Sequence, residues 1–468
     1  MTRSIPALTG LFLVALAGGA GCSGSDATTA AKELHGWRAA EVNVVSRTAT
    51  GAGVAATTSL RPDGGLETVA VDLASGRKLW AYPATMVGRL PGMGVQAPAV
   101  VATGDGQGVV AAIEPTSNDG GGRGEGGGEG GGGGGGAALV VRDARTGARK
   151  WVRPVHSTFG PQRCGPNLCL PENTALSRAR VVALDPVGGE PRWRLPGIAE
   201  VQWSDPSRVV VLRLAEHPTL EARDARSGKA LWSTPVEQAL GPGVDLSGGW
   251  SFGATHRNLV GYIAPYTNPK TKTTSAFGMF SVRLADGHIN WIRPSVVRVY
   301  PSGSPGFAPV VRPVDGQGEY GGFALLDADS GRVRGQIGTG QIPGTGWWLA
   351  FPEQPSTLGF LKHNAGGAAF DLGTGQATPL EGRRGWSFCV TDPKPLRLAN
   401  IKPSGFYPVA SLCEYDLATG KRVSTGSATP PLWFTGSQDG WRLWRDEKGA
   451  LHGVRDGSAT TPGMYGIA

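Results

Sequence analysis

Residues 69–80 read VAVDLASGRKLW, and the same pattern returns four more times with a tryptophan at its end. In each copy an apolar run is followed by a tight turn containing Gly and then by a second short run. The further copies are 140–151 VVRDARTGARKW, 182–193 VALDPVGGEPRW, 221–232 EARDARSGKALW and 281–291 SVRLADGHINW. Three weaker copies without the tryptophan follow, namely 324–335 ALLDADSGRVRG, 368–379 AAFDLGTGQATP and 413–424 CEYDLATGKRVS.

The spacing of the repeat predicts its architecture. The turn glycines are spaced by 71, 42, 39, 59, 44, 44 and 45 residues, at Gly76, Gly147, Gly189, Gly228, Gly287, Gly331, Gly375 and Gly420. Most intervals are close to the period of a four-stranded propeller blade, roughly 40–45 residues, and loop insertions explain the two long ones. We therefore expect an all-β fold, an eight-bladed β-propeller of four-stranded antiparallel blades. Seven blades are the alternative if one weak copy is not a full blade.

Each copy has the composition of a β-hairpin. Small or β-branched residues before the turn suit a buried strand, and Gly supplies positive φ at little steric cost. In seven copies an Asp precedes the Gly by four residues, where its carboxylate can accept hydrogen bonds from backbone N–H groups two or three residues on. These are Asp72, Asp143, Asp185, Asp224, Asp327, Asp371 and Asp416, whereas the fifth copy has Arg283 there and Asp286 beside its Gly.

The alternative role for these carboxylates is a metal or acid–base site. Equivalent turns in successive units would be spread around a ring instead of meeting at one centre, so we interpret the Asp residues as structural. The seven His residues are scattered, with no pair at the spacing of metal ligands. No G-x-S-x-G nucleophile elbow occurs, so the sequence offers no catalytic set, no metal site and no cofactor site.

A tryptophan follows the turn Gly by four residues in the first five copies, at Trp80, Trp151, Trp193, Trp232 and Trp291. A large ring at one fixed place in each unit is predicted to pack between neighbouring sheets, and its burial contributes on the order of 2–3 kcal/mol. Stacking on sugars or bases is the alternative. The less regular tryptophans are candidates for exposed contacts, with core or closure packing as the alternative: Trp250, Trp347, Trp348, Trp433, Trp441 and Trp444.

The D-x-x-[TS/G]-G-x-x-x-W pattern resembles the pyrroloquinoline-quinone-type propeller repeat over roughly Val69 to Val423. That repeat occurs in quinoprotein alcohol dehydrogenases and in the non-enzymatic lipoprotein of the outer-membrane barrel assembly machine. The dehydrogenases carry a vicinal Cys–Cys disulfide and Glu, Asn and Asp ligands for calcium. This chain has no adjacent Cys pair, and the calcium ligands match no motif in it. It therefore resembles the non-enzymatic lipoproteins more, which implies a scaffold role.

The first residues predict export. Arg3 gives a positive start, an apolar stretch runs from Leu8 to Ala17, and small residues lead to Cys22. This resembles the bacterial lipobox, in which the Cys is acylated, although Gly19 stands where Leu is usual. We expect residues 1–21 to be an export signal peptide, 22–36 the lipidated Cys and a flexible tether, and 37–468 the propeller. The predicted location is the outer face of the cell membrane, with secretion as the alternative if Cys22 is not lipidated.

The other cysteines suit an exported chain. If Cys22 carries lipid, four of the five remain, and an even number favours disulfides outside the cytoplasm. Neighbouring positions suggest the pairs Cys164–Cys169 and Cys389–Cys413. A four-Cys zinc site is the alternative, but no close C-x-x-C pair supports it.

Three segments lie between or beyond the repeats. Residues 118–137 are predicted to be a disordered surface loop, because 120–136 are almost all Gly. The gap between Gly228 and Gly287 includes Tyr262, Tyr266, Lys270 and Lys272, and we expect an extended rim loop there, or a plain hairpin elaboration. The short runs after Gly420 are predicted to pair with N-terminal strands and close the ring.

Charge narrows the partners. The formal net charge is +8 from 45 basic and 37 acidic residues, and no basic run interleaves with aromatic residues, so nucleic acid is not an expected partner. Rim loops are where propellers usually bind. The sequence therefore predicts a monomeric, membrane-tethered propeller that binds a protein or a cell-envelope polymer, without a cofactor. The alternatives are a quinoprotein-like enzyme and a ligand-sensing module of an envelope signalling system.

Overall fold

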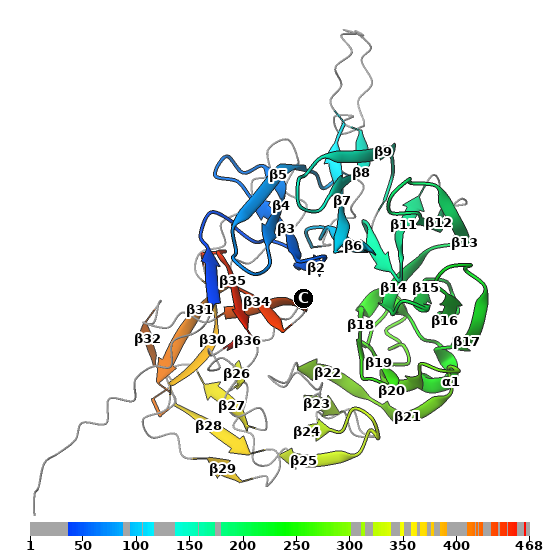
Figure 1. Ribbon diagram of the computed structural model, residues 1–468. Coiled ribbons are helices and arrows are strands. Elements are labelled where there is room, and N and C mark those ends of the chain that lie inside the picture. Colours follow the sequence, from blue (N-terminus) through cyan, green and yellow to red (C-terminus); the bar gives the residue numbers. More distant parts are fainter. Residues whose placement is uncertain are drawn as a thin grey trace, which may run out of the picture. The chain divides into compact units, whose positions relative to one another are not determined.

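Each copy of the repeat forms the last two strands of its own antiparallel sheet (Figure 1). In the first copy the turn at Gly76 joins β4 (Leu66–Asp72) to β5 (Lys78–Ala84). Two strands precede them, β2 (Ala49–Gly51) and β3 (Val54–Leu60), and the order in the sheet is β2-β3-β4-β5. The computed structural model describes residues 36–300 except 88–93, 105, 117–135, 158 and 174–178, and beyond residue 300 mainly the strands themselves.

The sheet β2–β5 is blade 1, and the following blades repeat its strand order. Blade 2 consists of β6 (Ala99–Gly104), β7 (Gln107–Pro115), β8 (Ala137–Asp143) and β9 (Arg149–Pro154). Blade 3 consists of β10 (Gln162–Cys164), β11 (Asn167–Asn173), β12 (Ala179–Leu184) and β13 (Pro191–Pro196). Blade 4 consists of β14 (Ala199–Ser204), β15 (Arg208–Arg213), β16 (Thr219–Asp224) and β17 (Ala230–Pro235). Blade 5 consists of β18 (Trp250–Ala254), β19 (Asn258–Ile263), β20 (Gly278–Arg283) and β21 (Ile289–Pro294). Blade 6 consists of β22 (Val296–Tyr300), β23 (Val310–Pro313), β24 (Phe323–Leu326) and β25 (Val333–Ile337).

The later blades are shorter in their outer strands. Blade 7 has β26 (Trp347–Ala350), β27 (Thr357–Lys362), β28 (Gly366–Asp371) and β29 (Ala377–Thr378), and blade 8 has three described strands, β30 (Arg384–Val390), β31 (Ala410–Asp416) and β32 (Arg422–Ser424). Two short helices, α1 (Glu237–Leu240) and the 3₁₀ turn η2 (Leu246–Gly248), lie between blades 4 and 5. The expected all-β propeller of four-stranded antiparallel blades is therefore observed, with one sheet for each of the eight repeat copies.

The two ends of the chain form a further sheet, as the closure prediction required. It contains β33 (Leu432–Gln438), β34 (Trp441–Arg445) and β35 (Leu451–Arg455), and its fourth strand is the N-terminal β1 (Gly36–Ala39). Strand β1 pairs with β35 in the register Gly36↔Val454 to Ala39↔Leu451. The short β36 (Gly463–Met464) runs parallel to β33. We call this sheet the closing sheet. Among the described strands it is additional to the eight repeat blades.

The middle strands are buried on both sides. In β15, Val209, Val210, Val211 and Leu212 are all fully buried. A strand covered by side chains on both of its faces consists of consecutive apolar residues, because every position meets a neighbouring sheet. Inner strands of successive blades also contact one another, as in β2 with β6 and β10 with β14. The core is therefore the set of interfaces between blades.

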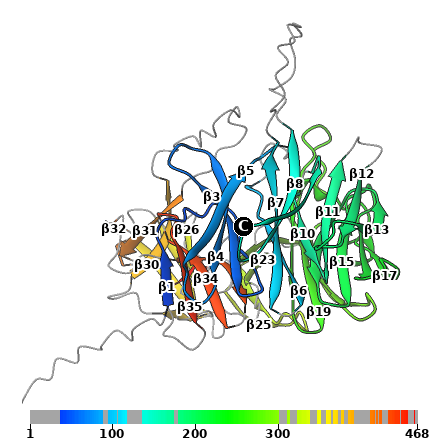
Figure 2. The same cartoon turned by 45° about the horizontal axis from the view of Figure 1, so that its top comes forward.

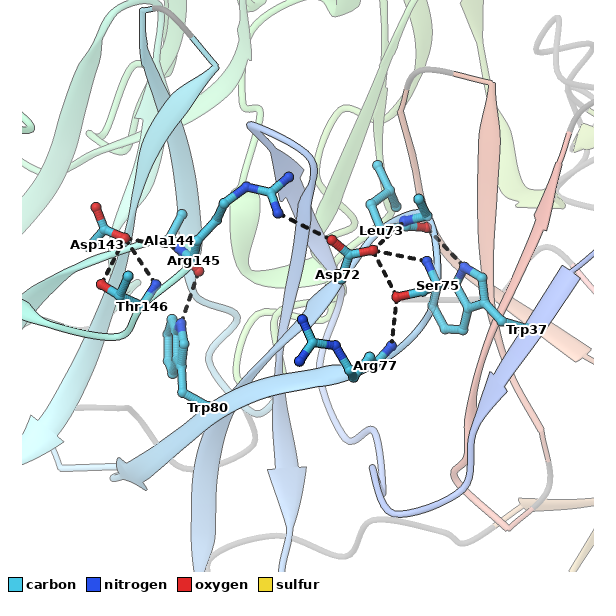
Figure 3. A network of polar contacts seen from close by, with 11 residues as sticks. Trp37, Asp72, Leu73, Ser75, Arg77, Trp80, Asp143, Ala144, Arg145 and Thr146 are labelled. Carbon is cyan, nitrogen blue, oxygen red and sulfur yellow. Dashed lines mark hydrogen bonds and ion pairs between the residues drawn. The ribbon is translucent and has the colours of Figure 1, made fainter.

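The tryptophans connect one blade to the next (Figure 3). The Trp80 indole Nε1 on blade 1 donates a hydrogen bond of 2.9 Å to the carbonyl of Ala144, the residue after Asp143 in the turn of blade 2. The same bond recurs between each later pair up to blade 6: Trp151 to Pro186, Trp193 to Ala225, Trp232 to Leu284 and Trp291 to Ala328, at 2.9–3.1 Å. The predicted packing of these rings between sheets is thus confirmed.

The turn Gly lies against the tryptophan of the preceding blade. A Cβ on Gly228, whose φ is +70°, would lie 2.5 Å from the Trp193 ring, and Gly147, Gly189, Gly287 and Gly331 stand in the same relation to the tryptophans before them. Gly is therefore required for two reasons: the backbone there is left-handed, and the Trp ring occupies the space that a Cβ would need. A register shift just before the turn accompanies the pairing Ala222↔Trp232, and the same irregularity occurs beside the other four repeat tryptophans.

The two ends of each blade differ (Figure 2). The turn between strands one and two lies beside the repeat turn, because the N–H of Leu73 donates to the Gly53 carbonyl at 3.0 Å and that of Ala225 to the Ser207 carbonyl at 2.8 Å. We call the end formed by these turns the turn face. The loops that join strands two and three, and the connections between blades, leave from the opposite end, which we call the loop face.

Replacing Gly228 by Ala tests the double role of the turn glycine. Gly228→Ala combines backbone strain with a clash against Trp193, and we expect a loss of about 2–4 kcal/mol in the free energy of unfolding. Gly106→Ala is the matched control, because Gly106 has the same φ of +70° with nothing within 4 Å of the added Cβ. It should lose only about 1 kcal/mol. Denaturant unfolding followed by circular dichroism measures both; equal losses would refute the contact with Trp193.

Candidate functional site

The repeat aspartates cap their own turns, as predicted. The Asp143 carboxylate accepts hydrogen bonds from the backbone N–H of Arg145 at 3.2 Å and of Thr146 at 3.0 Å, and from the Thr146 hydroxyl at 2.9 Å. The backbone bond from Thr146 lowers the pKa of Asp143, and together with the other donors it outweighs the effect of burial. The pKa values of Asp72, Asp185, Asp224 and Asp327 are also lowered.

The fifth copy reaches the same end with different residues. Asp286 accepts from Arg283 Nε at 2.8 Å and from the backbone N–H of His288 at 3.1 Å, so the carboxylate has moved to the other side of the turn. The Arg283 guanidinium holds the pKa of Asp286 at about 2. The turn is therefore kept although the usual Asp is missing.

The structure does not gather the repeat aspartates at one centre. Each of them lies in the turn of its own blade, and in the described part of the chain no group of three or more His, Cys, Asp or Glu side chains is placed to hold a metal ion. In the last two copies Asp371 and Asp416 end strands β28 and β31, while Gly375 and Gly420 lie outside the described residues. The repeat is scaffold wherever it is described.

One predicted disulfide is present. Cys164 and Cys169 are bonded, with their Cα atoms 5.6 Å apart, across the hairpin of β10 and β11. The hairpin tip contacts the turn of blade 4, where Asn167 Nδ2 donates to the Ala225 carbonyl at 2.5 Å. Strand pairing places Cys389 opposite Ser411 and Cys413 opposite Ser387. The side chains of Cys389 and Cys413 lie outside the described residues, as does Cys22, so those assignments stay predictions.

The disulfide hairpin borders a cavity of about 410 Å³ at the inner strands. The lining comes from four neighbouring sheets, with Thr50 on β2, Val100 on β6, Gln162 and Arg163 beside the disulfide, and Gly436 on β33. Gln162 is held by the Val201 N–H, which donates to its Oε1 at 3.1 Å, and Arg163 is exposed. Hydroxyls, an amide and a guanidinium suit a polar or anionic ligand.

The cavity residues do not fit a calcium-held quinone. Calcium takes six to eight oxygen ligands, mainly carboxylates and carbonyls. The described lining supplies the hydroxyls of Thr48 and Thr50 and the amide of Gln162, and none of its residues is an acid, a histidine or a cysteine. We derive no redox step at this site.

The loop face carries a well-formed projection between β19 and β20. Thr267 and Thr274 form a β-bridge, and the Ser275 N–H donates to the Tyr266 carbonyl at 2.9 Å. At the tip, the Asn268 side chain accepts the N–H of Lys270 at 2.9 Å. The rim loop and the hairpin elaboration, which were alternatives, are thus one object: a β-hairpin that leaves the rim. We call residues 264–277 the rim hairpin.

The base of the rim hairpin is fixed to the connection between blades 4 and 5. The Ala264 N–H donates to the Gly249 carbonyl at 2.9 Å and the Ala276 N–H to the Gly243 carbonyl at 3.0 Å. Beneath it, Val236 and Val244 pack in the same apolar cluster as Phe280. The tip residues Lys270, Thr271, Lys272 and Thr273 are exposed, and neither lysine forms a salt bridge with a described residue. A rigid support thus carries two positive charges into solvent.

Other expected contact residues serve packing. Tyr262 lies on β19, and its hydroxyl donates to the Val297 carbonyl at 2.6 Å. Trp444 is buried, Trp441 packs against Trp37 at 6.2 Å between ring centroids, and Trp250 Nε1 donates to Glu200 at 3.0 Å. These three follow the core or closure alternative. The side chains of Trp347, Trp348 and Trp433 lie outside the described residues.

Trp37 is the residue that the repeat pattern missed. Its Nε1 donates to the Leu73 carbonyl at 2.9 Å, and a Cβ on Gly76 would lie 2.3 Å from its ring (Figure 3). It therefore does for the closing sheet what Trp80 does for blade 1. No repeat copy surrounds Trp37, so the residue type was its only signal in the sequence.

No protein-family model matches the sequence, and no curated protein is similar to it in sequence. The structure is similar to that of BamB from Moraxella catarrhalis, at 12% identity and a TM-score of 0.42 over 89% of this chain and 95% of that one. It is also similar to Saccharomyces cerevisiae Sqt1, at 10% identity and 0.41 over 91% and 99% of the chains. A Pseudomonas putida HK5 quinohemoprotein alcohol dehydrogenase matches at 11% identity and 0.41 over 94% and 78%.

Such identities concern the fold alone, and the fold here rests on the sheets themselves. Among the described residues, no helix is long and apolar enough to cross a membrane.

The capped turns predict acid sensitivity. Because the folded pKa values of these aspartates lie below their ordinary value of 3.8, the stability they contribute is complete above that pH and is lost as pH falls through the lowered values. We expect the free energy of unfolding to fall steadily below about pH 4. Asp143→Asn should flatten this fall in denaturant titrations, with Asp63→Asn, at an exposed loop, as control. An identical pH profile for Asp143→Asn and the unchanged protein would contradict the capping role.

Proposed function

We propose that the protein is an exported lipoprotein, anchored through Cys22, whose propeller binds a protein or cell-envelope partner as a scaffold. One observation carries the binding part of this proposal: the rim hairpin is held at its base, along its strands and at its tip, yet residues 270–273 at the tip are exposed. A segment ordered by its own hydrogen bonds has little entropy left to lose on binding. Its two lysines favour an acidic surface on the partner.

The lipid anchor and the partner are supported by different features. Small residues before Cys22 support the anchor, together with the disulfide Cys164–Cys169, which suits an oxidising compartment. The partner is supported by the loop face alone. The cavity beside Gln162 and Arg163 favours a second function, the sensing of a small polar or anionic ligand at the inner strands. A ligand bound in this cavity would lie within reach of four sheets.

Photo-crosslinking tests the partner site. A photoreactive residue placed at Thr271, at the tip of the rim hairpin, should capture one defined partner in intact cells, whereas the same residue at Ala74, which is also exposed but lies on the turn face, should not. Lys270→Glu with Lys272→Glu should reduce the Thr271 adduct by about tenfold. If both positions captured the same molecules, or if the double variant gave an undiminished adduct, the rim hairpin would not be the binding site.

Cys22→Ser tests the anchor. The unchanged protein should remain in the membrane fraction after a high-salt wash, because acyl chains resist salt. The variant should be released into the wash. Retention of Cys22→Ser through the wash would rule out lipidation at this residue.

A further inference from the structure

We infer that the turn face of the propeller lies on the membrane and binds its anionic lipid headgroups. The placement of this face rests on the proposed anchor at Cys22, whereas its affinity for lipid does not. The inference gives the two faces separate roles, with lipid at the turn face and the partner at the loop face.

The chain enters the propeller at the turn face. Strand β1 begins at Gly36, and the next residue, Trp37, binds the Leu73 carbonyl in the repeat turn of blade 1. Gly36 pairs with Val454 near the end of β35. The segment that begins at residue 22 therefore joins the propeller at the turn face.

Exposed cations are spread over the turn face. Each is long, lies in or beside a turn of the turn face and forms no salt bridge with a described residue. They come from blades 1, 2, 4, 5 and 6 and are Arg77, Arg149, Arg226, Lys229, Arg257 and Arg332. The positive charge is thus distributed over the face, as an extended planar surface of negative charge requires.

Most acids of the turn face are partly covered or paired. The capping carboxylates of Asp72, Asp143, Asp185 and Asp327 are only 17–24% exposed and accept backbone N–H groups of their own turns. Among the more exposed carboxylates described there, Asp286 is paired with Arg283 and Asp329 accepts from Thr255, which leaves Glu190. A surface approaching this end meets guanidinium and ammonium groups first.

The loop face differs in that its exposed acids, apart from Asp63, form no salt bridge with a described residue and lie among exposed basic residues. Glu41 and Glu216 are exposed there beside Arg47, Lys270 and Lys272, and Arg61 is paired with Asp63. Attraction of each basic residue to an anionic bilayer is weak and screened within about 8–10 Å in physiological salt. An anchor that keeps the face near the bilayer raises its effective concentration, so several weak contacts suffice to orient the propeller.

Vesicle binding by the full chain carrying Cys22→Ser tests the face without the anchor. We expect binding to vesicles of phosphatidylglycerol and phosphatidylcholine in roughly equal parts, no binding to phosphatidylcholine alone, and loss of binding as salt rises. Charge reversal on the turn face, Arg226→Glu with Lys229→Glu and Arg257→Glu, should weaken binding about tenfold or more. The matched control on the loop face, Arg47→Glu with Lys270→Glu and Lys272→Glu, changes the net charge equally and should weaken it by about threefold at most.

Three outcomes would overturn the assignment of lipid binding to the turn face. Equal losses in the two triple variants would show that net charge alone drives binding. The other two are absent binding to the anionic vesicles and tighter binding to a soluble polyanion such as polyphosphate. Melting temperatures are measured to check that both variants fold. Arg77→Gln with Arg332→Gln offers a milder second pair, for which we expect about a threefold loss. Because no acyl group is present, failure here leaves the anchor proposal standing, and failure of Cys22 lipidation leaves this result standing.

Discussion

The fold depends on one contact between successive blades: an indole that donates to the backbone carbonyl of the next turn and stacks over its glycine. The contact joins burial of a large ring, worth on the order of 2–3 kcal/mol, to a hydrogen bond that satisfies a carbonyl between sheets. Six such contacts run from the closing sheet to blade 6 among the described residues. The Asp cap shapes the turn that presents the carbonyl, so Asp, Gly and Trp form a single device.

The sequence predicted the roles of Asp, Gly and Trp only as far as the residues concerned lie close together in the chain. Asp and Gly belong to one hairpin, so local chemistry sufficed to assign their roles, and Trp was recognised from its fixed offset. The partner atom of each Trp, a carbonyl in another blade, has no sequence signature. Trp37 escaped notice for the same reason, because its strand pairs with β35, more than 400 residues further along. The inner cavity was also unforeseen, since it is assembled from short strands of four sheets that carry no motif.

The division between the two faces explains why the chain contains both repeated segments and segments that depart from the repeat. The turn face is built from the repeat and cannot vary without loss of packing between blades. Loops on the opposite end join strands two and three and bear none of these contacts, so they are free to lengthen, as in the rim hairpin at 264–277. Sequence features that depart from the repeat therefore collect where a partner can reach them.

The position of Trp37 also has a consequence for the order of assembly. Strand β1 is made first, yet the strand that pairs with it, β35, is made among the last. The indole bond from Trp37 to Leu73 spans only 36 residues, whereas the ion pair from Arg38 to Asp446 spans 408. A short loop closes at a smaller entropic cost than a long one. Blade 1 can therefore hold β1 in place early in synthesis, and the last strands then add to an edge that is already positioned.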